Sequence, residues 1–173
     1  MSGTERRVAA VSGVKNSGKT TLLEKLIRAL TDRGLQVAVI KHDGHHFEPD
    51  VPGTDSWRHR QAGAYGTAIY DGEKYLMVKT AQITPEALMN QFPEADLILL
   101  EGAKDSPWPK FEIVRGGNSE RPVCDPATLL ALVTDLPLSL PGVPTLGLED
   151  IDGMVRLLLD RFGLSNKKEG DAP

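Results

Sequence analysis

The chain has 173 residues, of which 40% are hydrophobic and 25% are charged, and its formal net charge is −4 at pH 7. This length and charged fraction predict one compact domain with a sizeable core and exclude disorder throughout. The acidic balance argues against a broad nucleic-acid-binding surface, and the lone Cys124 excludes an internal disulfide framework.

No stretch approaches the 18 or so consecutive apolar residues of a membrane span, and the N-terminus has no apolar leader. We therefore expect a cytoplasmic protein that does not contact a membrane.

Residues 8–11 are a short apolar run, and apolar residues at helical spacing predict a helix over 20–33 that ends before Gly34. Residues 37–40 are apolar and mostly β-branched, as in a strand covered on both faces. This order is a βαβ unit.

Residues 41–56 hold three of the four histidines together with prolines and glycines, which is typical of a functional loop. A short helix is expected from about Asp55 to Ala62. Two apolar runs around Asp71-Gly72 predict a β-hairpin over 66–79. Thr84-Pro85 favours the start of a helix that ends near residues 92–93.

The remaining sequence predicts further strands and a last helix. Apolar residues 97–100 form a buried strand that stops at Glu101-Gly102. Further strands are expected at 110–115, where the pattern alternates, and at 129–133 and 145–148, and a helix from Asp150 or Asp152. The prediction is an α/β domain over residues 1–165, with a mostly parallel sheet and a β-hairpin insert, followed by a polar tail over 166–173.

Residues 13–20 match the phosphate-loop pattern G-x-x-x-x-G-K-[ST] at every fixed position. Backbone N–H groups of such a loop point at phosphate oxygens, Lys19 adds a positive charge, and the Thr20 hydroxyl is a hard ligand for Mg²⁺. The expected strand before it and helix after it favour a three-layer P-loop NTPase fold. The predicted nucleotide-binding residues are Gly13, Lys15, Asn16, Ser17, Gly18, Lys19, Thr20 and Thr21, although Lys15 either contacts phosphate or points to solvent.

A P-loop NTPase also needs an acidic group at the end of another buried strand, and Glu101 supplies it. Thr20 and Glu101 are the expected Mg²⁺ ligands. Asp55 and Glu101 are the candidate catalytic residues, and Asp43 and Asp50 are further candidates for holding Mg²⁺ or water. None is a convincing catalytic base, which predicts slow turnover at most.

Three features allow two interpretations each. His42, His45 and His46 either bind a transition metal or, in an exposed loop, make hydrogen bonds or bind substrate. Arg58, His59 and Arg60 either steer a phosphorylated ligand or cover a solvated helix. Asp135 ends a strand, where its carboxylate either accepts hydrogen bonds from guanine N1 and N2 or forms a turn before Pro137.

The chain resembles the molybdopterin-guanine dinucleotide biosynthesis protein B (MobB) family in several stretches that together span most of residues 7–135. These are Gly13 to Thr21, Lys41-His42 through His45-His46 with Asp50, Pro52 to Ser56 leading to Arg58 and Ala62-Gly63-Ala64, Leu100 to Lys104 with Pro109-Lys110, and the late Thr134-Asp135. The resemblance implies a homodimeric GTP-binding protein that uses Mg²⁺ and has weak GTPase activity. It also implies a supporting role in attaching GMP to molybdopterin, in partnership with the MobA-type guanylyltransferase.

Two other functions fit the phosphate loop. A P-loop small-metabolite kinase would need an acceptor pocket and an arginine-bearing lid, for which Arg115 and Arg121 beside Gly116-Gly117-Asn118 are candidates. A binding module would use the nucleotide only as a switch. The residues alone do not separate GTP from ATP.

Overall fold

The computed structural model describes residues 6–44 and 47–167. The chain forms two compact units, one from residues 1–42 with 88–173 and the other from residues 43–87. The predicted hairpin insert thus belongs to a unit of its own, and one nucleotide-binding domain over residues 1–165 stays a prediction.

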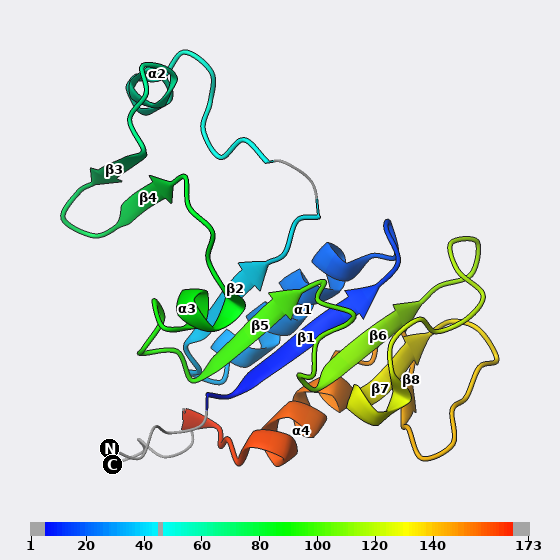
Figure 1. Cartoon of the computed structure of the whole chain (residues 1–173). Coiled ribbons are helices and arrows are strands. Elements are labelled where there is room, and N and C mark those ends of the chain that lie inside the picture. Colours follow the sequence, from blue (N-terminus) through cyan, green and yellow to red (C-terminus); the bar gives the residue numbers. More distant parts are fainter. Residues whose placement is uncertain (1–5, 45–46, 168–173) are drawn as a thin grey trace, which may run out of the picture. The chain divides into compact units, whose positions relative to one another are not determined.

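A six-stranded sheet, parallel throughout, is the frame of the first unit, with strand order β2-β5-β1-β6-β7-β8 (Figure 1). The strands are β1 (Val8–Gly13), β2 (Val37–Lys41), β5 (Leu97–Glu101), β6 (Lys110–Val114), β7 (Leu129–Thr134) and β8 (Thr145–Leu146). Short runs of aliphatic residues build the central strands, because a strand inside a parallel sheet is covered on both faces. Together with the helices described next, this sheet confirms the predicted α/β fold with a mostly parallel sheet.

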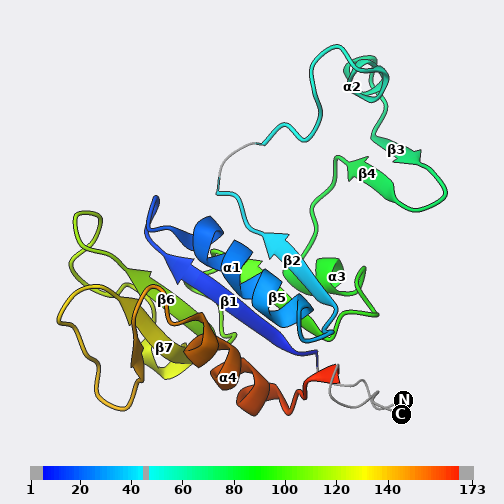
Figure 2. The same cartoon turned by 180° about the vertical axis from the view of Figure 1, so that it is seen from behind.

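Helices α1 (Lys19–Thr31) and α4 (Ile151–Phe162) lie on one face of this sheet (Figure 2). Leucines at helical spacing form the buried stripe of α1: Leu22, Leu23, Leu26 and Leu30. They pack with Met154, Val155 and Leu158 of α4. Each fully buried side chain of this kind stabilises the fold by about 1.5–3 kcal/mol.

The opposite face of the sheet has a second, smaller apolar cluster. Met89, at the end of α3 (Pro85–Met89), packs there with Val8 and Ile98. Ala103 and Trp108, from the segment between β5 and β6, add to this cluster. The sheet is therefore packed on both faces, as the three-layer arrangement requires.

One local prediction for this unit holds in part and one needs correction. β2 packs on both faces, because Val37 lies against the cluster of α1 and α4 whereas Ala38 and Ile40 lie with Met89, but Val39 is 38% exposed. Helix α3 ends at Met89 and not near residue 92, because Gln91 and Phe92 donate to carbonyl groups three residues back and form turns. In the predicted polar tail, Lys167 is held by Asp96 at 2.8 Å and by the carbonyl of Arg33.

The second unit contains α2 (Asp55–Gln61) and an antiparallel hairpin of β3 (Gly66–Tyr70) and β4 (Tyr75–Lys79), which confirms both predictions. The hairpin loop has four residues, since Tyr70 pairs with Tyr75. The Asp71 side chain closes it by accepting hydrogen bonds from the N–H groups of Glu73 and Lys74 at 2.8 and 2.9 Å. Among the described residues, no helix has the length and apolarity that a membrane span needs.

Candidate functional site

The phosphate loop connects the end of β1 to the start of α1, at the carboxyl edge of the sheet. Gly13 and Gly18 have φ of 143° and 94°, which only glycine adopts without strain. A Cβ on Gly13 would lie 2.7 Å from the carbonyl oxygen of Ile113, so the loop passes close to β6. Helix α1 begins without a side-chain N-cap and without an acidic residue in its first turn. Its first N–H groups are therefore available to an anion.

Lys19 lies across this loop. Its ammonium group donates hydrogen bonds to the carbonyl oxygens of Val14 at 2.7 Å and Gly13 at 3.3 Å. Burial lowers the pKa of Lys19, while Glu101 acts in the opposite direction. The charge of Lys19 is thus held at the loop, where it can interact with a phosphate group.

Glu101 lies beside the first turn of α1. In the sheet it pairs with Val11 of β1 on one side and with Lys41 of β2 on the other. Thr20 Oγ1 donates to Glu101 Oε1 at 2.9 Å, and Lys41 Nζ lies 3.7 Å from the same oxygen. The structure therefore brings together the two residues that the sequence predicts as Mg²⁺ ligands.

The turn after Glu101 is fixed against β1. Gly102 N donates to the carbonyl of Val11 at 2.9 Å, and Ser12 Oγ donates to the carbonyl of Gly102 at 2.5 Å. Gly102 has a φ of 94°, which lets the chain turn away directly behind the carboxylate. The end of β5 and the phosphate loop are thereby held in one rigid arrangement.

The Thr20 hydroxyl and the Glu101 carboxylate fit Mg²⁺, which needs few protein ligands. Among the described residues there is no group of three or more His, Cys, Asp and Glu side chains that could hold a metal ion. Mg²⁺ needs only one or two protein oxygens, because waters and phosphate oxygens complete its coordination. His42 is exposed and its backbone N–H donates to Glu101 O, whereas His45 and His46 lie outside the described residues. Metal binding by these histidines stays a prediction.

Asp135 directly follows β7, which lies two strands from β1. Its Oδ1 accepts a hydrogen bond from Gly116 N at 2.8 Å, and Thr134 Oγ1 accepts one from Leu136 N at 3.0 Å. The carboxylate therefore fixes the turn that follows β6. Guanine recognition by Asp135 stays a prediction, which the structure leaves open because no described residue bonds its Oδ2.

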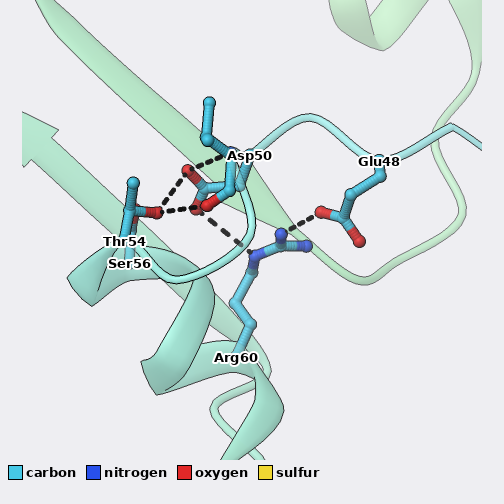
Figure 3. A network of polar contacts seen from close by, with 6 residues as sticks. Glu48, Asp50, Thr54, Ser56 and Arg60 are labelled. Carbon is cyan, nitrogen blue, oxygen red and sulfur yellow. Dashed lines mark hydrogen bonds and ion pairs between the residues drawn. The ribbon is translucent and has the colours of Figure 1, made fainter.

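The acidic residues of the 41–56 loop belong to the second unit, where Asp50 anchors the loop to α2 (Figure 3). Asp50 Oδ1 accepts from Thr54 Oγ1 at 3.1 Å and from Val51 N at 3.2 Å, and its Oδ2 lies 3.9 Å from Arg60 Nε. Arg60 also pairs with Glu48. The Ser56 hydroxyl, with these neighbours, holds the pKa of Asp50 below its ordinary value although burial opposes it.

Arg58 and Arg60, predicted either to steer a phosphorylated ligand or to cover a solvated helix, differ in their surroundings. The Arg60 side chain is only 13% exposed and is engaged by Glu48 and Asp50, so it does not cover a solvated surface. Arg58 is exposed and lies 3.8 Å from Asp55, whose own side chain is 90% exposed. A catalytic role for Asp55 stays a prediction.

Two buried charges on β6 were missed by sequence reasoning, because its alternating pattern resembles a strand with one face in water. Lys110 and Glu112 are both fully buried. Lys110 Nζ donates to the carbonyl oxygens of Lys104 and Ser106, and Glu112 accepts from the N–H groups of Val123 and Cys124. These hydrogen bonds compensate burial of the charges and tie two loops to one strand. No sequence signal reveals which charges will be covered.

Comparison with known proteins finds relatives that match most of the chain. Residues 8–135 match the family described as molybdopterin guanine dinucleotide synthesis protein B (MobB). The molybdopterin-guanine dinucleotide biosynthesis adapter protein of Escherichia coli is 37% identical over 163 residues, which cover 88% of this chain and 89% of that protein. The adapter protein of Haemophilus influenzae is 38% identical over 135 residues, 75% of each chain.

Solved structures of MobB proteins are also similar to this chain. The crystal structure of Bacillus subtilis MobB superimposes with a TM-score of 0.71 at 27% identity, and covers 87% of this chain and 97% of that one. A MobB homologue from Bacillus stearothermophilus has a TM-score of 0.65 at 24% identity, covers 90% and 97% of the two chains, and shares the fold.

Proposed function

Because the chain belongs to the molybdopterin-guanine dinucleotide synthesis protein B (MobB) family, we propose that it is a GTP-binding adapter that assists a MobA-type guanylyltransferase. The family assigns it a role in molybdenum cofactor biosynthesis and nucleotide binding through its phosphate loop. The finer proposal is that it binds GTP with Mg²⁺, hydrolyses GTP slowly and supports the attachment of GMP to molybdopterin.

The observation that carries the nucleotide proposal is the joint position of the phosphate loop and Glu101. Both lie at the carboxyl edge of the sheet, where β1 stands between β5 and β6. From β1 the chain leads to β2 on one side of β1, and from β5 it crosses to β6 on the other side. Open α/β sheets bind ligands at such a change of direction.

Different residues of this site would bind the phosphate oxygens and the Mg²⁺ ion. The N–H groups of the loop and Lys19 would hold and orient the phosphate oxygens, and Thr20 and Glu101 would hold Mg²⁺. When bound, Mg²⁺ neutralises charge on the phosphates. Glu101 is already bonded to Thr20, so it serves metal binding better than activation of water. Positioning without a committed base fits slow hydrolysis.

Calorimetry with Mg²⁺-GTP on the wild-type protein and on Lys19→Ala tests this proposal. Loss of a charged hydrogen-bond donor from the phosphates should weaken binding by about a hundredfold. Lys25→Ala is a matched control, because Lys25 lies on the same helix and pairs with Glu149 at 2.5 Å outside the loop. Equal GTP affinity of the wild-type and Lys19→Ala proteins would contradict the proposal.

Asp135→Asn tests the choice of base. The variant keeps Oδ1 as the acceptor for Gly116 N, and replaces only the other oxygen by a donor group. If Asp135 accepts from guanine N1 and N2, the preference for GTP over ATP should fall by about tenfold or more, with ATP affinity unchanged. An unchanged ratio of the GTP and ATP dissociation constants would assign Asp135 to the turn alone.

The hairpin of the second unit supports the proposed homodimer. Its exposed apolar residues occupy both faces: Ile69 (52%) and Leu76 (48%) on one, and Tyr70 (83%), Tyr75 (68%) and Met77 (64%) on the other. A two-stranded hairpin is marginally stable by itself, and an apolar surface of this kind marks a contact site. A second copy of the chain would cover it.

The adapter role itself is tested with a MobA-type guanylyltransferase and molybdopterin. Formation of the guanine dinucleotide should be faster with this protein than without it, and Lys19→Ala should lose the effect. Equal rates with and without the wild-type protein would contradict the assisting role.

A further inference from the structure

The turn that follows β6 reaches the phosphate loop. Asn118 Nδ2 donates to the carbonyl of Lys15 at 3.0 Å, which ties the turn to the loop. On its other side, Gly116 N donates to Asp135 Oδ1 at 2.8 Å. The Arg115 carbonyl closes the turn by accepting from the N–H groups of Asn118 and Ser119. Arg115 thus begins a turn that is held in place next to the loop.

Strand register decides where the Arg115 side chain goes. Ile113 of β6 pairs with Gly13, the first residue of the phosphate loop, and its side chain lies in the core with α1. Side chains alternate along a strand, so Arg115 continues on the face of Ile113, beyond the end of β6. That face leads to the start of α1. Accordingly, Arg115 Nη1 lies 3.8 Å from the position that a Cβ on Gly18 would take.

The guanidinium group of Arg115 makes no ion pair with any residue that the structure describes. The side chain is exposed, and within residues 6–44 and 47–167 no carboxylate or carbonyl oxygen pairs with it. It lies instead beside a loop that carries Lys19 and beside a helix start with no acidic residue in its first turn. Glu101, the carboxylate of this site, accepts from Thr20 and faces Lys41, so the charge of Arg115 adds to that of Lys19 and favours binding of an anion.

We propose that Arg115 is a phosphate-binding residue of the nucleotide site, supplied by the same chain from the β6 side. The proposal rests on the proposed nucleotide binding. The guanidinium donates hydrogen bonds to phosphate oxygens, to which its planar fork is suited. The phosphates are then held by the loop and Lys19 from one side and by Arg115 from the other.

Arg115→Gln is the test variant, and Arg161→Gln is its matched control. Arg161 lies in the last turn of α4, so this change removes the same charge away from the phosphate loop. Calorimetry uses two probes, Mg²⁺-GTP and inorganic tripolyphosphate, which lacks base and sugar. Arg115→Gln should weaken both by about tenfold, whereas Arg161→Gln should change neither by more than about twofold. Arg115→Lys should restore part of the affinity, because it keeps the charge and loses the fork.

The outcomes separate this inference from the proposed function. If Arg115→Gln binds both probes as tightly as Arg161→Gln while Lys19→Ala binds both about a hundredfold more weakly, the Arg115 proposal is overturned and nucleotide binding stands. If the wild-type protein binds no Mg²⁺-GTP, both are overturned. If the free Arg115→Gln protein melts several degrees lower than the wild type, Arg115 has a structural role and the proposal is overturned as well.

Discussion

Thr20 Oγ1 donates a 2.9 Å hydrogen bond to Glu101 Oε1 and so joins the first turn of α1 to the end of β5. Lys41 Nζ approaches the same carboxylate oxygen at 3.7 Å. A hydroxyl and a carboxylate are both hard oxygen ligands, and a divalent cation bound by them would replace the contribution of the lysine. The contact therefore brings together the two oxygen ligands of the proposed Mg²⁺ site.

Glu101→Gln tests whether the Glu101 carboxylate binds Mg²⁺. The variant keeps the size of the side chain and removes the charge, so Mg²⁺ should increase GTP affinity much less than in the wild type. We expect about a tenfold loss with Mg²⁺ and little change in EDTA. Titrating GTP at a series of Mg²⁺ concentrations measures the difference. Glu149→Gln, a carboxylate 79% exposed that pairs with Lys25, is the control. An equal loss in EDTA would argue against metal binding by Glu101.

Gly13→Ala should destabilise the fold. A Cβ at this position meets Ile113 O at 2.7 Å and Ser17 Oγ at 2.8 Å, on a backbone with φ of 143°. We expect the free energy of unfolding to fall by about 1–3 kcal/mol, as measured by urea denaturation.

Gly117→Ala is the matched control for Gly13→Ala. Gly117 also has a positive φ, 75°, but nothing lies within 4 Å of its Cβ position. The Gly117→Ala variant should therefore lose less stability than Gly13→Ala. Its free energy of unfolding should fall only by the cost of the left-handed backbone, about 1 kcal/mol. Equal losses in the two variants would show that the close approach to β6 is unimportant.

Local patterns account for what the sequence predicts well. The phosphate loop is a contiguous motif, and Glu101 ends a contiguous apolar run, so both are recognised without knowing the fold. Arg115 is different, because its place beside the loop follows from the pairing of β1 with β6, about a hundred residues apart in sequence. For the same reason Lys110 and Glu112 look like residues of a solvated face until the covering loops are known.

The hairpin yields a contrasting case. Asp71-Gly72 predicts it correctly, yet the turn has four residues and is closed by the Asp71 carboxylate. Sequence reasoning identified the turn residues and missed which of them makes the hydrogen bonds.

Leu76→Lys should weaken the proposed dimer. Leu76 is 48% exposed on the apolar surface of the hairpin, and a charge placed there would lose its hydration when a second copy covers it. Light scattering over a range of concentrations should show a dissociation constant at least about tenfold higher than in the wild type. Val51→Lys, at a position 69% exposed in the same unit but outside the hairpin, should not change it. A wild-type protein that is monomeric at every concentration would exclude the dimer.

Acid should loosen the segment that Asp50 anchors. The pKa of Asp50 is lowered, chiefly by the Ser56 hydroxyl, so its carboxylate stabilises the folded unit at pH values above its unfolded pKa. This stabilisation is lost as the pH falls below about 4 and through the lower folded-state pKa. Fluorescence of Trp57 in α2, recorded in a Trp108→Phe background, follows the change.

Asp50→Asn provides the comparison for this acid transition. The variant has no carboxylate to titrate at this position, so its Trp57 signal should change less over the same pH range. Coincident pH curves for the two proteins would show that Asp50 does not control the segment.

Cys124 should resist alkylation in the folded protein. Burial, followed by the charge of Glu112, raises the pKa of its thiol to about 12. The thiolate is the reactive form, and a free cysteine has a pKa of about 8.5, so iodoacetamide should react with Cys124 mainly after unfolding. The raised pKa also means that its contribution to stability is present below about pH 8.5 and is lost as the pH rises toward 12.

Glu112→Gln is the informative variant for this thiol. Removing the charge lowers the pKa of Cys124, and alkylation at a fixed pH should be faster when corrected for any change in stability. Comparing the rate of labelling, measured by mass spectrometry, with the rate of unfolding distinguishes a lower thiol pKa from a loss of stability. Rapid labelling of the wild-type protein under native conditions would contradict the burial of Cys124.

The position of β1 in the sheet determines when the protein can assemble as it is synthesised. β1 leaves the ribosome before both of its neighbours, which come from residues 97–114. Parallel pairing over such sequence distances is slow to form. A nascent chain that stops before residue 114 thus carries the complete phosphate-loop motif with only part of the sheet that shapes it, and nucleotide binding should begin late in translation.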